Sequence, residues 1–247
     1  MIIFDEIKYA EHIIKYGCSR KYILVDFKIL AKYFLLYRHY SEEEAMENML
    51  SVLKDKQSII PLNYLPQKID LSIKYAKTED LKLSSAIHIT QEELAKIDSL
   101  PESVRELAFI YLFLWKWNKD TEFFIDKSDL KKLLKLSGVA NYKLDILDGE
   151  LEKLGFIKFV DYCRKEKVAV NLEQSDVSDL EITVEDFDNA ILYYRQHCGK
   201  KVIKCEDCGC LVEVRSNRQK YCKNCSTKHR TENLRVYKKR SRANKSL

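Results

Sequence analysis

Six of the eight cysteines lie between residues 198 and 225, and four of them form two regular pairs. Cys205 and Cys208 form one C-x2-C pair, Cys222 and Cys225 form another, and thirteen residues separate the pairs. Two such pairs bring four soft thiolate ligands within tetrahedral reach of one ion, which is the arrangement that Zn2+ takes in structural sites. We therefore expect one structural zinc ion with no open coordination position, and hence no catalysis by the metal.

Other sulfur and imidazole groups lie close to these pairs. Cys210 follows the first pair after one glycine, and His229 follows the second pair by four residues. His197 and Cys198 precede the first pair. Spacing alone leaves open whether Cys210, His197 or His229 joins the metal, but two regular pairs need no further ligand, so we interpret these residues as bystanders. We expect Gly209 to form a tight turn that directs backbone N–H groups at thiolate sulfur.

A strongly basic stretch follows the second cysteine pair. Its sequence is compatible with a helix capped by Ser226 or Thr227. A basic helix held at a metal centre is pre-oriented, which favours phosphate binding over the alternative of a solvated tail. Because no Asn/Gln pattern for reading bases accompanies it, we expect affinity more than sequence specificity. Spacings of seven, four and three place one set of cations on a single face, and a second set widens that face: Lys228, Arg235, Lys239 and Arg242, then Arg230, Lys238 and Arg240.

The charge of the chain is divided unevenly. The 43 Lys and Arg residues against 38 Asp and Glu residues give a formal net charge of +5. Residues 199–247 carry 15 basic and 4 acidic side chains, a net charge of +11, whereas the preceding 198 residues carry 28 and 34, a net charge of −6. Such an asymmetry indicates a segment that binds polyanions, attached to a body that does not.

The cysteine pairs and the basic segment after them resemble the short C-terminal zinc fingers of proteins from phages and mobile elements of low-GC Gram-positive bacteria. The sequences that carry this resemblance are K-C-E-D-C-G at 204–209 and K-Y-C-K-N-C at 220–225. The region also looks like a treble clef or zinc ribbon, in which the second cysteine pair leads into a helix. The resemblance implies a metal site and a phage or mobile-element source, but no single function.

The residues before the finger are apolar enough to form a folded support for it. The chain is 46% hydrophobic and 33% charged, which excludes a disordered body. Residues 1–120 predict a helical domain, because apolar residues recur at helical spacing and two capping boxes occur. The expected helices are 5–16 closed by Gly17, 27–37, one starting at Ser41, a short one starting at Thr90, and the most apolar one from Pro101 to Trp117.

Residues 121–172 change to a mixed pattern. A β-prone run at 123–125 is followed by two expected helices, at 128–136 and 141–154. Two alternating segments, at 156–163 and 167–172, are then expected to form a hairpin. This order of elements looks like a winged helix-turn-helix domain. The expected fold class is therefore mainly α with small β elements: a helical body, a winged-helix-like module, and a C-terminal four-cysteine zinc finger followed by a basic helix.

The second helix of this module is poorly suited to reading DNA. Four leucines from Leu144 to Leu154 form its apolar stripe, and the charged side chains that remain have a net charge of −2. Duplex DNA carries a negative charge every ~1.7 Å and would repel such a helix. We therefore favour a structural or protein-binding role for the module over direct base reading. The side chains expected on the exposed face are Lys143, Asp145, Asp148, Glu150, Glu152 and Lys153.

Residues 173–198 predict an acidic linker that leads into a short helix. Residues 168–194 contain no Lys or Arg and carry seven Asp and Glu residues. The simpler interpretation is a solvated connection before a helix over 184–197. The alternative is an intramolecular decoy that occupies the basic segment until another polyanion competes for it.

Signatures of several enzyme classes are missing from the sequence. No two of the six glycines are two residues apart, so a dinucleotide-binding G-x-G turn is excluded, and neither H-E-x-x-H nor G-x-S-x-G occurs. The longest apolar run, Leu107 to Trp115, is too short for a bilayer span of roughly 20 residues. Asp5 and Glu6 argue against a signal peptide. We expect a non-enzymatic protein of the cytoplasm, in a host bacterial cell.

These observations favour a zinc-stabilised phage or mobile-element protein with a regulatory or accessory role. Residues 199–247 would bind nucleic acid, and the acidic body would bind a host protein or a nucleoprotein complex. The alternative is an anti-CRISPR-type inhibitor, which would bind a host guide-RNA nuclease and block its nucleic-acid loading or activity. No residue motif identifies that class, so the alternative depends on the resemblance and on the charge of the body.

Overall fold

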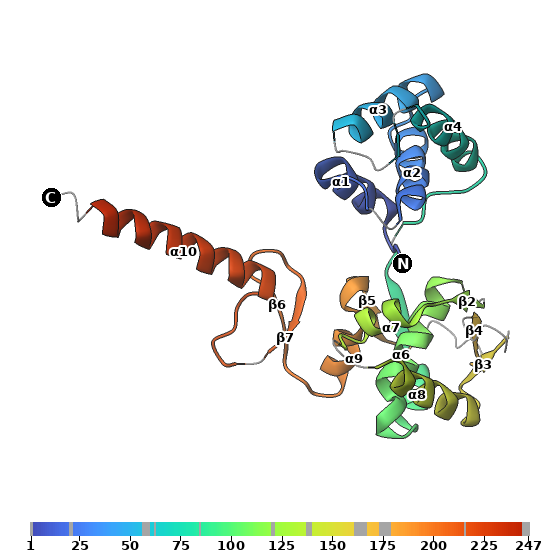
Figure 1. The fold of residues 1–247 in the computed structure, drawn as a ribbon. Coiled ribbons are helices and arrows are strands. Elements are labelled where there is room, and N and C mark those ends of the chain that lie inside the picture. The colour runs from blue at the N-terminus through green and yellow to red at the C-terminus, as the bar shows by residue number, and fades with distance from the viewer. Residues whose placement is uncertain are drawn as a thin grey trace. The chain divides into compact units, whose positions relative to one another are not determined.

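A computed structural model shows a chain that divides into two compact units, Ile2–Ser85 and Ala86–Leu247 (Figure 1). Each unit is considered by itself. The structure describes residues 2–19, 22–55, 60–61, 63–83, 85–119, 122–136, 140–160, 167–172, 179–214 and 216–243, without the side chains of residues 55 and 236–243.

The first unit, Ile2–Ser85, is a small helical bundle. Its elements are α1 (Glu6–Tyr16), α2 (Ile23–Lys32), the π-helical turn η1 (Tyr33–Tyr37), α3 (Glu42–Asp55) and α4 (Leu65–Ala76). Phe27 on α2, Met49 on α3 and Ile69 on α4 are all fully buried, so the core lies where these three helices face one another.

Capping residues determine where α1 and α3 begin. The Asp5 carboxylate accepts the Lys8 N–H at 3.0 Å. At the start of α3, the Glu44 N–H donates to Ser41 Oγ at 3.2 Å, and the Ser41 N–H donates to Glu44 Oε2 at 2.8 Å. These reciprocal bonds satisfy donors that have no partner inside the helix. The predicted start of each helix is confirmed.

Two elements of the first unit were not predicted in this form. Helix α2 begins four residues earlier than expected, at Ile23, and its continuation is the π-helical turn η1. Helix α4 has no predicted counterpart. It begins without a side-chain cap, with Pro66 in its first turn, and it buries Ile69 and Ile73 against the rest of the bundle. Packing of its apolar face therefore stabilises α4 more than any local start signal.

Two buried polar clusters link helices within the first unit. Lys32 Nζ lies 3.3 Å from Glu6 Oε1 and 3.2 Å from Glu79 Oε2. Asp26 accepts the Tyr9 hydroxyl at 2.9 Å, and burial together with this bond raises the pKa of Tyr9. Because each buried charge has a partner, we interpret both clusters as structural.

Helix α6 (Glu102–Trp117) forms the centre of the second unit, Ala86–Leu247. Every residue from Leu107 to Trp115 is buried, as its unbroken apolar run predicts. Helix α5 (Gln91–Asp98) starts at the predicted capping box of Thr90 and Glu93. Because both helices pack within this unit, the division of the chain falls near residue 85, not at the predicted boundary of a 1–120 helical domain. Within the described parts of the chain, no helix combines the length and apolar character that a membrane span needs.

Residues 180–197, predicted to form part of a linker and a short helix, belong to the folded core. Strand β5 (Leu180–Val184) pairs antiparallel with β1 (Ile87–Thr90), and α9 (Ala190–His197) packs against α6. Ile182 and Val184 face inward while Glu181 is exposed, so the strand alternates between core and solvent. Of the acidic residues in this stretch, Glu181 lies on the solvated face of the strand, and Asp179, Glu185, Asp186 and Asp188 lie in the residues that flank it. Residues 173–178 of the predicted linker lie outside the described residues.

A three-stranded sheet and two helices follow α6 in the chain. The elements are β2 (Phe123–Phe124), α7 (Lys127–Leu133), α8 (Asn141–Lys153), β3 (Ile157–Phe159) and β4 (Lys167–Val170). The strands lie in the order β2-β4-β3, with both pairings antiparallel. The predicted run of strand, two helices and hairpin strands is therefore present, with both helices somewhat shorter than expected.

Asp148 on α8 was expected on the exposed face, but the structure places it in the core. Its carboxylate accepts the Tyr111 hydroxyl of α6 at 2.6 Å and pairs with Lys127 Nζ. Burial and the neighbouring Asp148 charge raise the pKa of Tyr111 well above its usual value. Conversely, Leu154 was expected to be buried and is 47% exposed. The face of α8 turned to α6 is therefore rotated relative to the predicted one.

The Tyr111–Asp148 bond supports a stability prediction. Removing the hydroxyl in Tyr111→Phe leaves a buried carboxylate without one of its donors, so we expect a loss of about 1–3 kcal/mol in the free energy of unfolding. Urea unfolding of the full chain measures it. Tyr142→Phe, at a tyrosine that is 60% exposed on α8, is the control. Equal unfolding midpoints for the two variants would show that the buried bond contributes nothing.

The C-terminal part of the second unit is a hairpin followed by a long helix. Strand β6 (Val202–Lys204) pairs antiparallel with β7 (Leu211–Glu213), and α10 (Lys223–Ala243) begins ten residues after β7. The hairpin packs on α9, and Figure 1 shows it lying between α9 and the start of α10. The predicted finger followed by a basic helix therefore has a β-hairpin as its first half.

Candidate metal centre

The two cysteine pairs are brought together by the hairpin and by the start of α10. Cys205 directly follows β6, Cys208 ends the next turn, Cys222 directly precedes α10, and Cys225 lies in the first turn of that helix. Their four Sγ atoms all lie within 4.8 Å of one another. Cys205 and Cys225 are buried, whereas Cys208 is exposed. The structure thus gathers the four predicted ligands into one cluster.

The spacing of the sulfur atoms fits a tetrahedral metal. With Zn–S bonds of ~2.3 Å, neighbouring sulfurs of a tetrahedron lie about 3.8 Å apart. Cys208 Sγ and Cys222 Sγ are 3.8 Å apart. Four thiolates leave no coordination position for substrate or water, as in structural rather than catalytic zinc sites. The cluster is therefore compatible with one structural metal ion.

Backbone N–H groups point at the sulfur atoms of two ligands. The Cys222 N–H donates to Cys205 Sγ at 3.2 Å, and the Cys225 N–H donates to Cys222 Sγ at 3.4 Å. The Cys222 N–H, together with the N–H groups of Cys208 and Asp207, favours the thiolate form of Cys205 and lowers its pKa to about 6 despite desolvation. The Cys225 N–H likewise lowers the pKa of Cys222. Because the thiolate is the form that binds a metal, the fold prepares both ligands for it.

The tight turn at Gly209 is present, and N–H groups within it, those of Cys208 and Asp207, act on the Cys205 thiolate as predicted. Gly209 has a φ of +71°, which favours glycine. Its N–H donates to the Cys205 carbonyl oxygen at 2.9 Å rather than to a sulfur, and the Cys205 N–H donates to the Cys210 carbonyl oxygen at 2.8 Å. The glycine therefore closes the backbone loop around the first cysteine pair.

The neighbouring cysteine and histidines lie outside the four-sulfur cluster. The Cys208 thiol donates to Cys210 Sγ at 3.3 Å, so Cys210 contacts a ligand without belonging to the cluster. His197 Nε2 lies 3.1 Å from Asp98 Oδ2, and His229 Nε2 lies 2.5 Å from Asp207 Oδ2. Both histidines are thus engaged by carboxylates, which answers the question that spacing left open.

The His229–Asp207 contact also fixes how α10 leaves the metal centre. Asp207 lies inside the first cysteine pair, and His229 lies on the second turn of α10. The Tyr221 ring packs on the His229 ring with a centroid distance of 4.5 Å. The spacing of His229 indicates a metal ligand or a bystander, and it does not predict this contact. Two features of the sequence could have predicted the contact between Asp207 and His229. Asp207 lies between the first two cysteines, and His229 lies four residues after the last one.

Arg195 on α9 connects the finger to the body of the second unit. Its guanidinium bonds Glu106 of α6 at 2.8 and 2.7 Å, and Glu213 of β7 at 2.9 Å. The Arg195 side chain is only 14% exposed. Glu106 and Glu213 keep its pKa raised despite this burial. The guanidinium therefore bridges a core helix and the hairpin that carries the metal ligands.

We expect Arg195→Met to loosen the hairpin. The variant keeps an apolar chain in place of the aliphatic part of arginine but removes three charged hydrogen bonds, and we expect it to destabilise the contact by about 1–3 kcal/mol. Hydrogen exchange of residues 202–213 should quicken. Arg235→Met removes an exposed pair with Glu232 and should change exchange very little. If the two variants exchange alike, the Arg195 bridge does not hold the finger.

Helix α10 carries all seven residues predicted to contact nucleic acid. Over Lys223–Ala243 it has eight Lys and Arg residues against one Glu. Every side chain from residue 226 to residue 235 is exposed, including Lys228, Arg230, Arg235 and the 51% exposed Leu234. Lys238, Lys239, Arg240 and Arg242 also lie on the helix, with their side chains outside the described atoms.

Comparison of the chain with protein-family models, with curated proteins and with solved structures finds no match. The chemistry of the centre is therefore argued from its own residues.

Proposed function

We propose that the four-cysteine cluster binds one Zn2+ ion in a structural role. Cys205, Cys208, Cys222 and Cys225 would hold it, and the ion would neutralise part of the charge of four adjacent thiolates. The Sγ spacing and the N–H donors to sulfur support this assignment. The ion would tie the β6–β7 hairpin to the first turn of α10, so the direction of the helix would depend on the metal.

We infer that the protein binds nucleic acid through α10, in a non-enzymatic regulatory or accessory role for a phage or mobile element. One observation carries this inference: a helix of 21 residues with eight cations and one anion, whose side chains are exposed from residue 226 to residue 235, begins at the four-cysteine cluster. A helix that is polar all round gains little from packing on its own protein. Phosphate groups would supply the missing partner and would release counterions on binding.

The winged-helix-like module is proposed to support the protein rather than to read bases. The order α6, β2, α7, α8, β3, β4 and the sheet order β2-β4-β3 support a winged-helix arrangement. In that arrangement α8 would be the reading helix. Its exposed residues include the apolar Tyr142 and Ile146 and the acidic Asp145, which suit a duplex poorly. The acidic body would carry the module toward a protein partner.

Native mass spectrometry of the full-length protein, purified at low salt, tests this function. We expect one zinc ion per chain and bound nucleic acid that is lost when the salt is raised. A chain that carries zinc but retains no nucleic acid would contradict the nucleic-acid function and leave the metal assignment intact. A folded chain without zinc would contradict the metal assignment.

A second candidate function is inhibition of a host guide-RNA nuclease, of the anti-CRISPR type. The exposed apolar pair on α8 favours it: Tyr142 and Ile146 are 60% and 63% exposed, one helical turn apart. Asp145 lies between them in sequence, so a protein surface with apolar and basic groups would fit. Ile146→Glu tests this. It should abolish inhibition of nuclease cleavage without changing nucleic-acid binding, and unchanged inhibition would argue against the α8 face.

A further inference from the structure

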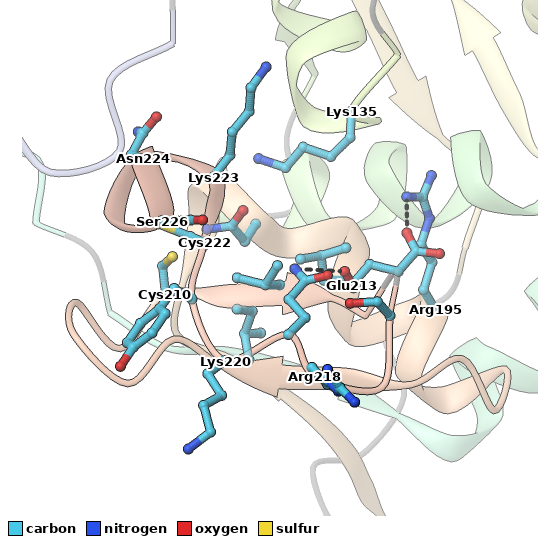
Figure 2. Close-up of a pocket in the computed structure, with 17 residues that line it drawn as sticks. Lys135, Arg195, Cys210, Glu213, Arg218, Lys220, Cys222, Lys223, Asn224 and Ser226 are labelled. Atoms are coloured by element: carbon cyan, nitrogen blue, oxygen red, sulfur yellow. Dashed lines mark hydrogen bonds and ion pairs between the residues drawn. The ribbon is translucent and has the colours of Figure 1, made fainter. Parts of the chain in front are cut away.

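A basic cleft of about 810 Å3 opens beside the metal centre. It is lined by the end of α7, by α9, by β7 and by the first turn of α10, all within the second unit. Figure 2 shows the Lys135 side chain, which follows α7, pointing toward the α10 turn that carries Lys223, Asn224 and Ser226. The cleft is as large as typical ligand sites, which occupy about 300–1,000 Å3.

Cations dominate the lining of the basic cleft. Its charged residues are Lys135, Arg195, Arg218, Lys220 and Lys223 against a single acid, Glu213. Arg195 is bound by Glu106 and Glu213, and Lys220 pairs with Glu206 at 3.2 Å. In the ion pairs found between described residues, Lys135, Arg218 and Lys223 take no part. Three cations of the cleft lining are therefore without an ion-pair partner among the described residues.

Lys135 is held at the cleft by an unusual backbone. Its φ of +57° lies in the left-handed region that favours glycine. Its Nζ donates to the Asp188 carbonyl oxygen at 2.5 Å. Desolvation by the surrounding protein lowers the pKa of Lys135, although Asp188 and Asp186 oppose this. The nearby acids thus compensate the ammonium only in part, and the exposed Lys135 side chain is accessible to an anion in the cleft.

The polar groups around these cations match the oxygens of phosphate. Asn224, Ser226 and Ser216 line the same cleft and offer amide and hydroxyl donors. Phosphate contacts in nucleic-acid complexes come from Lys and Arg together with Ser, Asn and Gln side chains. We propose that the basic cleft binds phosphate groups of a nucleic-acid strand.

The cleft and the exposed face of α10 would form one continuous path. Lys223 lines the cleft, and Arg230, seven residues later, lies on the same face of the helix. A strand that enters the cleft therefore continues along the cations of α10. This inference rests on the proposed nucleic-acid function of α10 and adds a second, more enclosed contact to it.

Lys135→Gly tests the cleft without harming the fold. Glycine adopts a φ of +57° without strain, so the variant should unfold at an unchanged or higher temperature while it loses the cleft cation. Lys119→Gly is a matched control, since Lys119 is exposed, follows α6 at a φ of +56°, and does not line the cleft. Both variants lose one positive charge from the second unit.

Fluorescence anisotropy of the full chain with a 20-nucleotide single strand and with a duplex provides the readout. For Lys135→Gly we expect binding on the order of fivefold weaker at ~50 mM salt, and a log–log salt slope reduced by about 0.9 for the duplex and about 0.7 for the single strand. Lys119→Gly should leave both the affinity and the salt slope unchanged. The double variant Lys223→Gln/Arg218→Gln should weaken binding further. Inorganic tripolyphosphate and a mononucleotide serve as further probes, and both should compete only weakly if a strand is the ligand.

The outcomes separate the cleft from α10. If Lys135→Gly and Lys119→Gly bind alike while substitutions on α10 weaken binding, the cleft proposal is overturned and the function of α10 stands. If Lys135→Gly weakens binding and α10 substitutions do not, the cleft proposal stands and the function of α10 fails. Strong competition by tripolyphosphate or by the mononucleotide would replace the strand with a free phosphate ligand and overturn the proposal. A wild-type chain that binds neither oligonucleotide overturns both.

Discussion

Cys205→Ser should release the metal and unfold the segment from β6 through the first turns of α10. Structural zinc contributes about 10–16 kcal/mol of binding free energy to small zinc-finger peptides, which exceeds what a two-stranded hairpin gains by itself. Cys205 is buried, and its sulfur accepts the Cys222 N–H, so serine would replace an anionic thiolate ligand by a neutral hydroxyl, which is a much poorer ligand for zinc. Metal analysis of the full-length chain should fall from one ion to none. Hydrogen exchange across residues 202–229 should approach that of an unfolded chain.

Two neighbouring cysteines provide controls for this result. Cys210→Ser removes a thiol whose sulfur lies 3.3 Å from that of Cys208, and Cys198→Ser removes an exposed thiol outside the cluster. Both variants should keep one ion per chain. Full metal content in Cys205→Ser, or loss of the ion in Cys210→Ser, would show that the ligand set is not the four cysteines assigned here.

Replacing Arg235 and Lys239 on α10 together should weaken nucleic-acid binding strongly and equally for every sequence. Each phosphate contact contributes about 0.9 to the slope of log affinity against log salt, so the double variant Arg235→Gln/Lys239→Gln should flatten that slope by about 1.8. At ~50 mM salt we expect affinity lower by a factor on the order of 10 to 100. Competition with oligonucleotides of different sequence provides the measurement.

A matched pair on the first unit controls for the loss of two charges. Lys8 and Lys74 are exposed, at 79% and 67% of their side chains, and Lys8→Gln/Lys74→Gln should leave binding unchanged. The helix content of α10 should be the same in both double variants by circular dichroism. A change in sequence preference after the α10 substitutions would mean that the helix reads bases, contrary to our interpretation.

Features that depend on neighbours in sequence were the ones that could be predicted. The capping boxes at Ser41 and Thr90 each act over three residues, and both helices begin there. The ligand cluster could likewise be predicted, because a C-x2-C pair places its own two sulfurs close together. The long apolar run of α6 needs burial on every side, whatever the surrounding topology.

Features that depend on distant partners could not be read from the sequence. Strand β5 pairs with β1 over about ninety residues, so its short acidic sequence looks like a linker when taken alone. In the sequence, Asp148 looks like a solvated charge on α8, because its hydrogen-bond donor, the hydroxyl of Tyr111, is 37 residues away. The basic cleft could not be predicted for the same reason, because Lys135 and Lys223, which both line it, are 88 residues apart in the sequence. Pairing and burial at such separations are set by tertiary packing, which local patterns do not encode.

The affinity of the full-length, zinc-loaded chain for a nucleic-acid duplex, measured from 50 to 200 mM salt, decides whether a zinc-anchored α10 binds phosphate. We expect a steep fall in affinity with salt, by a factor on the order of 10³ or more if six or more phosphates are contacted, and loss of most binding once a chelator removes the metal. Affinity that is absent at 50 mM salt, or that does not change with salt, would contradict a zinc-anchored helix that binds phosphate.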